Sequence, residues 1–241
     1  MKNCFRYILL IAVIASFASC EKDNYTAPGS FLTGALTYKG DTIRVERNQV
    51  PYQLYQYGFG AVGPISGTFA QDGSYSQVLF NGNYKLIIPN GQGPFMWKQD
   101  ASGNPDSLSI TMSGSQNLTL EVTPFYMVRN AQFGYSASDS MVTATFKAEK
   151  IVTDPDMMKD IERVSLYVNN TEFTSGGDNI AFTNMAGGDI TNPDNITLSV
   201  RVPFETNLST FTQGNLYARV GIKMVNVEDM IFSDVEIVSI K

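Results

Sequence analysis

Apolar and polar residues alternate in short runs along most of this chain, which is the pattern of half-buried β-strands. The clearest example is residues 68–88, where the dipeptides Asp72-Gly73 and Asn81-Gly82 separate three predicted strands. Both dipeptides favour tight turns, because Gly and Asn adopt a positive φ easily. The last strand places its larger apolar residues on one face: Tyr84, Leu86 and Ile88. We therefore predict a hairpin unit of three strands and two turns.

The same alternation predicts strands on both sides of this unit. They cover residues 31–39, 50–54 and 117–123 in the first half, and residues 126–135, 141–148, 161–168, 196–202, 216–225 and 232–240 in the second. Pro124 follows an alternating run at mid-chain and marks a domain boundary. Strand and turn spacings after it are typical of an immunoglobulin- or fibronectin-type sandwich. The predicted fold class is all-β, with two tandem β-sandwiches at residues 30–123 and 124–241.

The beginning of the chain has the pattern of a lipoprotein signal peptide, which we assign to residues 1–19. Lys2 and Arg6 precede a short apolar run, and small residues end it. The run is too short for a typical membrane span, and polar sequence follows it at once.

The small residues before Cys20 resemble a bacterial lipobox, which implies that Cys20 is lipidated and that residues 20–29 form a tether. The alternative is an ordinary signal peptide with an incidental cysteine. Residues 21–24, Glu-Lys-Asp-Asn, resemble the signal that sends Bacteroidetes lipoproteins to the outside of the outer membrane. We expect a lipid-anchored outer-membrane protein that faces the cell surface, with the periplasmic face as the alternative.

Composition narrows the possible chemistry. The formal net charge is −6, and loss of Lys2 and Arg6 with the signal peptide gives −6 − 2 = −8. An acidic surface disfavours nucleic acid as a partner. The absence of histidine excludes a His general base and an imidazole zinc site. Both cysteines, Cys4 and Cys20, lie within the first twenty residues, so the body of the protein has no thiol nucleophile. We predict no catalytic residue, cofactor or metal.

A row of aromatic residues follows the strand at residues 50–54. If the alternate residues of that strand face inward, Tyr55, Tyr57 and Phe59 point outward together. Aromatic faces bury the apolar faces of sugar rings, so this row predicts a glycan-stacking site. Trp97, after a Gly- and Pro-rich loop, is expected to extend the same edge. The alternative is that these aromatics close the end of the sandwich or pack on the second domain.

Other chemistry receives less support from the sequence. Acidic loops offer oxygen ligands for calcium, but none matches a complete calcium-binding loop. Two carboxylates for glycoside hydrolysis can meet only in space, so an enzyme stays as a third alternative. Three Asp-Ser/Thr-aliphatic triplets resemble the O-glycosylation site of Bacteroidetes. They predict modification of Thr42, Ser107 and Ser140.

Four segments of the first half occur in an order similar to that of carboxypeptidase-regulatory-like, transthyretin-like (prealbumin-like) β-sandwiches. They are GALTY at 34–38, VPYQL at 50–54, DGSY at 72–75 and NGNYKL at 81–86. With the lipobox and the second sandwich, the chain resembles a Bacteroidetes family of two-domain lipoproteins of unknown function. That resemblance implies association with starch-utilisation-type glycan import loci, and it supplies no functional residues.

These observations lead to a non-catalytic surface lipoprotein as the predicted function. We expect it to bind glycan or to help assemble a polysaccharide-uptake system, with glycan or outer-membrane importer proteins as partners. The alternative is a cell-adhesion or structural module that contacts protein. The third reading is a glycoside-active enzyme.

Overall fold

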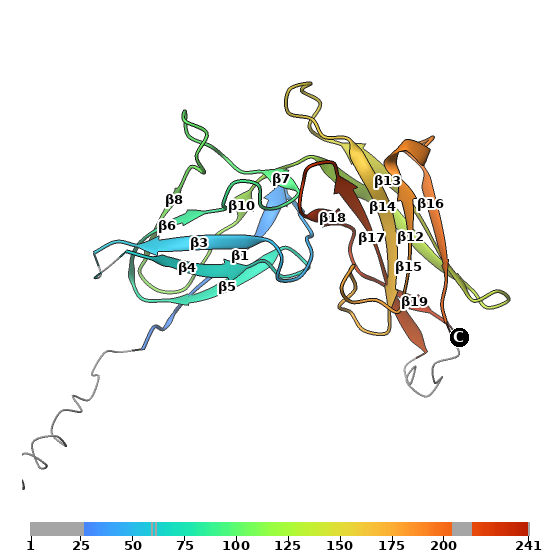
Figure 1. The fold of residues 1–241 in the computed structure, drawn as a ribbon. Helices are drawn as coiled ribbons and strands as arrows, with labels where there is room; N and C mark the ends of the chain where they lie inside the picture. Colours follow the sequence, from blue (N-terminus) through green and yellow to red (C-terminus); the bar gives the residue numbers. More distant parts are fainter. Residues whose placement is uncertain (1–26, 59, 61, 204–213, 241) are drawn as a thin grey trace, which may run out of the picture.

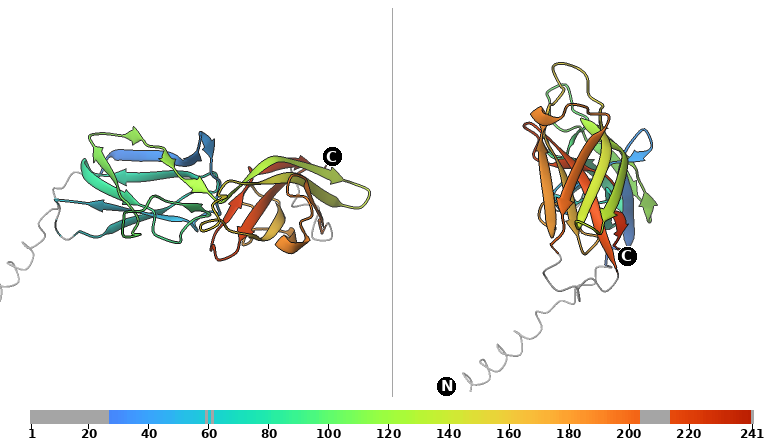
Figure 2. Two further views of the ribbon diagram at one scale, coloured as in Figure 1. Left: turned by 90° about the horizontal axis from the view of Figure 1, so that it is seen from above. Right: turned by 90° about the vertical axis from the view of Figure 1, so that its right-hand side faces the viewer.

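The computed structural model describes residues 27–58, 60, 62–203 and 214–240. In these ranges the protein is all-β and forms two domains that follow each other along one axis (Figures 1 and 2). The prediction of an all-β, two-domain protein is confirmed. No helix among the described residues is long and apolar enough to cross a membrane. The predicted signal peptide and Cys20 lie outside the described residues.

The N-terminal domain is a sandwich of two sheets. Its strands are β1 (Ser30–Tyr38), β2 (Asp41–Thr42), β3 (Pro51–Gln56), β4 (Pro64–Thr68), β5 (Ser74–Leu79), β6 (Gly82–Ile87), β7 (Phe95–Met96), β8 (Leu108–Met112), β9 (Gln116–Asn117), β10 (Leu120–Glu121) and β11 (Thr123–Pro124). One sheet has the order β4-β3-β6-β8, and the other is built around β1, which pairs with β2, β5, β9 and β10. Strands β7 and β11 form a separate pair beside the second domain (Figure 1).

Aromatic rings fill the centre of this sandwich. The ring centroids of Tyr52, Phe69 and Tyr75 lie 5.2 to 5.7 Å apart, and all three residues are almost fully buried. The Tyr75 hydroxyl donates a hydrogen bond to the Leu118 carbonyl at 2.7 Å, which satisfies its polar end. Burial raises the pKa of Tyr75, so the hydroxyl remains a donor.

The predicted apolar face of the strand after Asn81-Gly82 is confirmed. Its three residues are all buried, with exposed fractions of 2% for Tyr84, 0% for Leu86 and 0% for Ile88. The hairpin arrangement is wrong, because β5 pairs with β1 whereas β6 pairs with β3 and β8. The Asn81-Gly82 turn therefore carries the chain from one sheet to the other. The physical reason is that both strands have a buried face, and two buried faces are best covered by each other across the sandwich.

The Asp72-Gly73 turn crosses between the sheets in the same way, and a side chain stabilises it. Asp72 Oδ1 accepts hydrogen bonds from the Ser74 backbone N–H at 3.0 Å and from the Ser74 hydroxyl at 2.7 Å. Partial burial acts to raise the pKa of the Asp72 carboxyl, but these hydrogen bonds outweigh it and hold the pKa below its usual value. The charged carboxylate thus stabilises the fold.

This lowered pKa predicts a loss of stability in acid. The contribution of Asp72 is fully present above its unfolded pKa of about 4 and is lost as the pH falls through the lower folded pKa. An Asp72→Asn variant keeps the acceptor but does not titrate. We expect the difference in free energy of unfolding between wild type and variant to shrink as the pH falls from 6 to 3. Urea denaturation across that range measures it, and a constant difference would contradict the prediction.

The C-terminal domain also contains two facing sheets. Its elements are β12 (Tyr126–Ser136), β13 (Met141–Lys150), β14 (Ile161–Asn169), β15 (Ala181–Ala186), the 3-10 helix η1 (Gly187–Asp189), β16 (Ile196–Arg201), β17 (Asn215–Met224), β18 (Met230–Phe232) and β19 (Glu236–Ser239). One sheet has the order β12-β13-β16. The other has the order β15-β14-β17-β18, with β19 also paired to β17.

Five of the six strands predicted in this half match observed strands within a few residues. The sixth prediction, residues 232–240, corresponds to the end of β18 and the separate strand β19. Both pair with β17, at opposite ends of it, so a single strand at residues 232–240 is wrong. The Ser233 backbone N–H still donates to the Val220 carbonyl of β17 at 2.9 Å, and the chain then leaves the sheet before β19 begins at Glu236.

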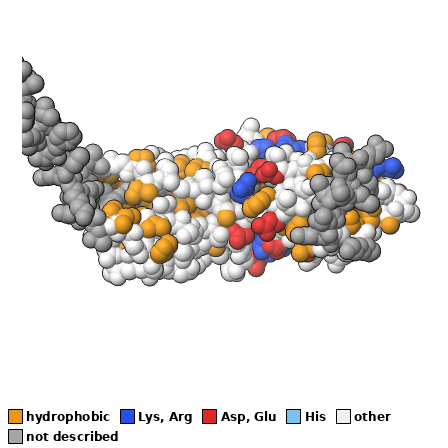
Figure 3. All heavy atoms as spheres, turned by 90° about the horizontal axis from the view of Figure 1, so that it is seen from below, with side chains coloured by type: hydrophobic (Ala, Val, Ile, Leu, Met, Phe, Trp, Pro, Cys, Tyr) orange, Lys and Arg blue, Asp and Glu red, His pale blue; other side chains and the backbone are white. Residues whose placement is uncertain are grey.

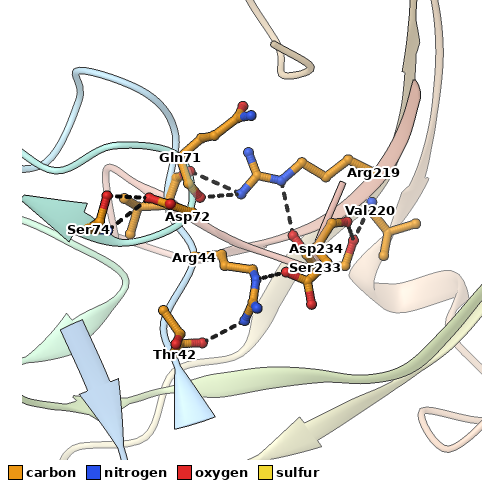
Figure 4. A network of polar contacts seen from close by, with 10 residues as sticks. Thr42, Arg44, Gln71, Asp72, Ser74, Arg219, Val220, Ser233 and Asp234 are labelled. Atoms are coloured by element: carbon orange, nitrogen blue, oxygen red, sulfur yellow. Dashed lines mark hydrogen bonds and ion pairs between the residues drawn. The ribbon is translucent and has the colours of Figure 1, made fainter. Parts of the chain in front are cut away.

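A buried arginine joins the two domains. Arg219, from the central strand β17, is 1% exposed, and its guanidinium stacks on the Phe232 ring with 4.1 Å from Cζ to the centroid. Its Nη2 donates to the carbonyls of Val45 at 3.1 Å and Gln71 at 3.0 Å in the N-terminal domain, while Nε donates to the Ser233 carbonyl (Figure 4). We call this region the domain joint.

Backbone pairing and ions extend the domain joint. The Phe232 N–H donates to the Arg44 carbonyl at 3.1 Å, so a short β-bridge crosses between the domains. Arg44 also forms an ion pair with Asp234 (Figure 4). On another side of the joint, the Gly93 N–H donates to Asp229 Oδ2 at 2.7 Å. Directional bonds from several segments hold the two domains in one relative orientation.

Candidate functional site

The outer face of the β4-β3-β6-β8 sheet brings the predicted tyrosines together. Tyr55 and Tyr57 project from this face next to Lys85, which is the cross-strand partner of Tyr55 and places Nζ 5.6 Å from the Tyr57 ring centroid. Tyr57 is 51% exposed, whereas Tyr55 is half-buried and hydrogen-bonded through its hydroxyl to Gln53 Oε1 at 2.8 Å. We call this surface the tyrosine platform. Phe59, the third predicted member, lies outside the described residues.

Uncharged polar groups surround the tyrosines. Asn83 and Thr111 are neighbours across β6 and β8, and the Thr111 hydroxyl donates to Asn83 Oδ1 at 2.9 Å. Ser66 on β4 and Ser109 on β8 are exposed on the same face. The platform therefore combines aromatic faces with amide and hydroxyl groups that both donate and accept hydrogen bonds.

The region around the platform is poor in charge. Between Arg47 and Lys85 the chain carries one charged residue, Asp72, which lies near Arg44 at the domain joint. Figure 3 shows that charged side chains gather around the joint. The platform thus offers apolar contact and hydrogen bonding without a strong electrostatic field.

Trp97 is not part of this surface. It follows β7, at the end of the domain that meets the second domain, whereas the loop after β3 lies at the far end (Figure 1). Trp97 lines a pocket of about 710 Å³ together with Met157 and Val227 of the C-terminal domain. The prediction that Trp97 extends the aromatic row is wrong. Between residues 57 and 97 the chain runs the length of the domain, so these two positions lie at opposite ends of it.

Paired charges line a second pocket, which lies at the domain joint. It has a volume of about 590 Å³, and its lining includes Asp41, Arg44, Arg129 and Asp234. Arg44 pairs with Asp234, and Arg129 pairs with Asp41. Because these charges already have partners, they stabilise the domain joint and leave few groups free to bind a ligand.

The three predicted O-glycosylation residues do not cluster. Thr42 is half-buried beside the domain joint, Ser107 is half-buried just before β8, and Ser140 is half-buried at the turn before β13 with φ of +58°. Their modification stays a prediction. In the described part of the chain, no group of three or more Asp, Glu, Cys or His residues is arranged to hold a metal ion.

Sequence reasoning missed two features of this architecture. The first is the pocket around Trp97, whose walls come from segments far apart in the sequence. The second is Arg219, and here a signal existed. A single arginine in the otherwise apolar centre of β17 faces away from the core, so its burial requires a second packing surface.

Comparison with known proteins identifies the family. The model described as "Protein of unknown function (DUF3823) N-terminal domain" matches residues 30–123, and that described as "Domain of unknown function (DUF3823_C)" matches residues 126–237. No curated protein matches the chain.

Solved structures give the same picture. A DUF3823 family protein from Parabacteroides merdae is 30% identical with a TM-score of 0.73, and the match covers 89% of this chain and 100% of that one. One from Bacteroides ovatus is 29% identical with a TM-score of 0.72, covering 88% and 100%. A "putative carbohydrate binding protein" from Bacteroides uniformis shares the fold at 16% identity, with a TM-score of 0.65 and coverage of 88% and 100%. The chain belongs to the DUF3823 family and carries both of its domains.

Proposed function

We propose that this protein is a non-catalytic carbohydrate-binding protein and that the tyrosine platform contacts a neutral glycan. The observation that carries the proposal is the grouping of Tyr55, Tyr57 and Lys85 on one open sheet face. The Bacteroides uniformis relative described as a "putative carbohydrate binding protein", which shares the fold, supports the same ligand class. In finer terms, we take the first domain as transthyretin-like and the second as immunoglobulin-like.

The chemistry of the platform favours sugar rings. An aromatic face removes the C–H face of a pyranose from water, and the exposed half of Tyr57 is available for that contact. Amide and hydroxyl groups such as Asn83 and Thr111 match sugar hydroxyls, which also donate and accept. An open sheet face leaves room for several consecutive rings of a polymer.

Electrostatics favours a neutral glycan over a polyanion. Lys85 is the one charged side chain of the platform, and it already lies over the Tyr57 ring. The chain carries a formal net charge of −6, which repels a polyanion at long range. A neutral polymer meets neither the repulsion nor the desolvation of repeated charges.

We place this binding at the cell surface. Acylation of Cys20 anchors the chain in the outer membrane, and partners of the protein are glycan or the outer-membrane proteins of a polysaccharide importer. The lipobox-like sequence before Cys20 and the short export-like segment after it support this location.

Affinity electrophoresis against neutral and acidic plant and fungal polysaccharides tests the proposal. We expect retention by at least one neutral polymer and a loss of about tenfold in affinity for Tyr57→Ala, which corresponds to about 1.4 kcal/mol. Phe182→Ala is a matched control, because Phe182 is 55% exposed on the C-terminal domain, away from the platform. Retention by no polymer, or equal retention of Tyr57→Ala and wild type, would refute the platform.

A further inference from the structure

The pocket at Trp97 is built by both domains. The N-terminal domain contributes Gln92, Met96 and Trp97, and the C-terminal domain contributes Met157 and Lys159. Its volume of about 710 Å³ lies within the range of small-molecule sites, which is roughly 300 to 1,000 Å³. We call it the Trp97 pocket.

Hydrogen bonds fix the walls of this pocket. The Trp97 indole Nε1 donates to the Asp106 carbonyl at 2.8 Å, so the ring is held by its polar edge while it remains partly exposed. The Gly93 N–H donates to the buried carboxylate of Asp229 at 2.7 Å, and the Phe125 N–H donates to the Pro94 carbonyl at 3.2 Å. These bonds tie the loop before Trp97 to the second domain, so the pocket exists before any ligand arrives.

The lining combines apolar and polar groups in a way that selects for a particular ligand. The indole ring and the thioethers of Met96 and Met157 provide apolar contact, and Met157 is 46% exposed. Amides of the loop provide donors and acceptors. Two cations and two anions line the pocket, and they cancel in formal charge: Lys98, Lys159, Glu121 and Asp156.

We propose that the Trp97 pocket binds the end of a saccharide, one or two rings long, as a second site separate from the tyrosine platform. A sugar presents a C–H face to the indole and hydroxyls to the amides and charged groups. A purely apolar ligand leaves those polar groups unpaired, which is unfavourable. An ionic ligand gains no net attraction from a lining whose formal charges cancel. A pocket with walls from two domains limits how many rings fit and so favours a chain end, whereas the open platform accepts a chain interior.

The composition of the chain supplies a direct readout, because Trp97 is its one tryptophan. Tryptophan emission, excited at the red edge of the absorption band where tyrosine does not absorb, therefore reports on this pocket alone. The probes are neutral di- to tetrasaccharides of glucose, xylose, mannose and galactose, with an uncharged tetrapeptide as comparison. We expect a saturable change in Trp97 emission with at least one saccharide, in wild type and equally in Tyr57→Ala.

Two neighbouring methionines give a matched pair for the same titration. Met157→Ala removes a wall of the pocket and is expected to weaken saccharide binding at least tenfold. Met158→Ala, 40% exposed but outside the pocket lining, is expected to leave it unchanged. No emission change with any saccharide, a change with the tetrapeptide alone, or a change abolished by Tyr57→Ala would overturn the second site. None of these outcomes affects polysaccharide retention by the platform, so the two proposals fail separately.

Discussion

Replacing Arg219 with methionine is expected to lower the free energy of unfolding by about 3 kcal/mol and to separate the unfolding of the two domains. The substitution leaves the carbonyls of Val45, Gln71 and Ser233 without their donor, and each buried unpaired carbonyl costs about 1–3 kcal/mol. Part of this loss is offset. Desolvation, together with the nearby charge of Arg44, lowers the pKa of Arg219, which shows that the buried guanidinium itself is held at some energetic cost.

Denaturation in urea, followed by circular dichroism and by Trp97 fluorescence, measures this effect. We expect the two probes to coincide in wild type and to diverge in Arg219→Met, because Trp97 reports on the N-terminal domain and the joint. Arg163→Met on the adjacent strand β14 is the matched control. Its side chain is 34% exposed and paired with Glu162, so the change should cost less than about 1 kcal/mol. Coincident transitions and unchanged stability in Arg219→Met would contradict a role in holding the domains together.

Gly73→Ala is the second substitution with a large expected effect, a loss of about 3 kcal/mol or more. Gly73 has φ of +81°, and a Cβ built on it lies 2.0 Å from the Ile43 carbonyl oxygen. The positive φ alone costs a non-glycine residue roughly 1–2 kcal/mol. The contact with backbone adds to this, because a carbonyl within a paired segment cannot move as a flexible side chain does. The turn itself is also bonded, since the Gly73 carbonyl accepts from the Leu36 N–H at 3.0 Å.

Gly40→Ala separates the two contributions. Gly40 has φ of +90°, and a Cβ added to it meets nothing within 4 Å. It therefore has the backbone strain without the clash, and we expect a loss of about 1 kcal/mol. Chemical denaturation of both variants beside wild type gives the comparison. Equal losses at the two positions would show that the close approach to Ile43 has no energetic weight.

Local pattern was enough to predict most of the strands, because period-2 alternation reports directly which face of a strand is buried. Strand β13 shows this, with Val142, Ala144 and Phe146 buried and their neighbours more exposed. Pairing was harder. The dipeptides Asp72-Gly73 and Asn81-Gly82 do make turns, but a turn sequence does not say whether the next strand stays in the sheet or crosses to the facing one.

The same distinction, between what local pattern determines and what long-range packing determines, applies to the candidate sites. Tyr55 and Tyr57 could be predicted because they belong to one strand and its continuation, so alternation alone places them together. The position of Trp97 could not, because its neighbours Met157 and Lys159 come from the other domain and only the joint brings them near. Strand β15 was missed because its exposed face includes Phe182, which breaks the expected apolar–polar alternation.

The joint around Arg219 has a consequence for the kind of polymer that this protein can distinguish. The pocket wall that Met157 and Lys159 form belongs to the second domain, so a stiff connection keeps this wall at one fixed position relative to Trp97 and to the tyrosine platform. A polysaccharide that reaches from one to the other gains the effective concentration of an intramolecular contact, whereas a shorter one occupies a single site. The protein then selects polymers by length. Affinity rises in a step at the chain length that spans both sites instead of growing gradually with each added sugar.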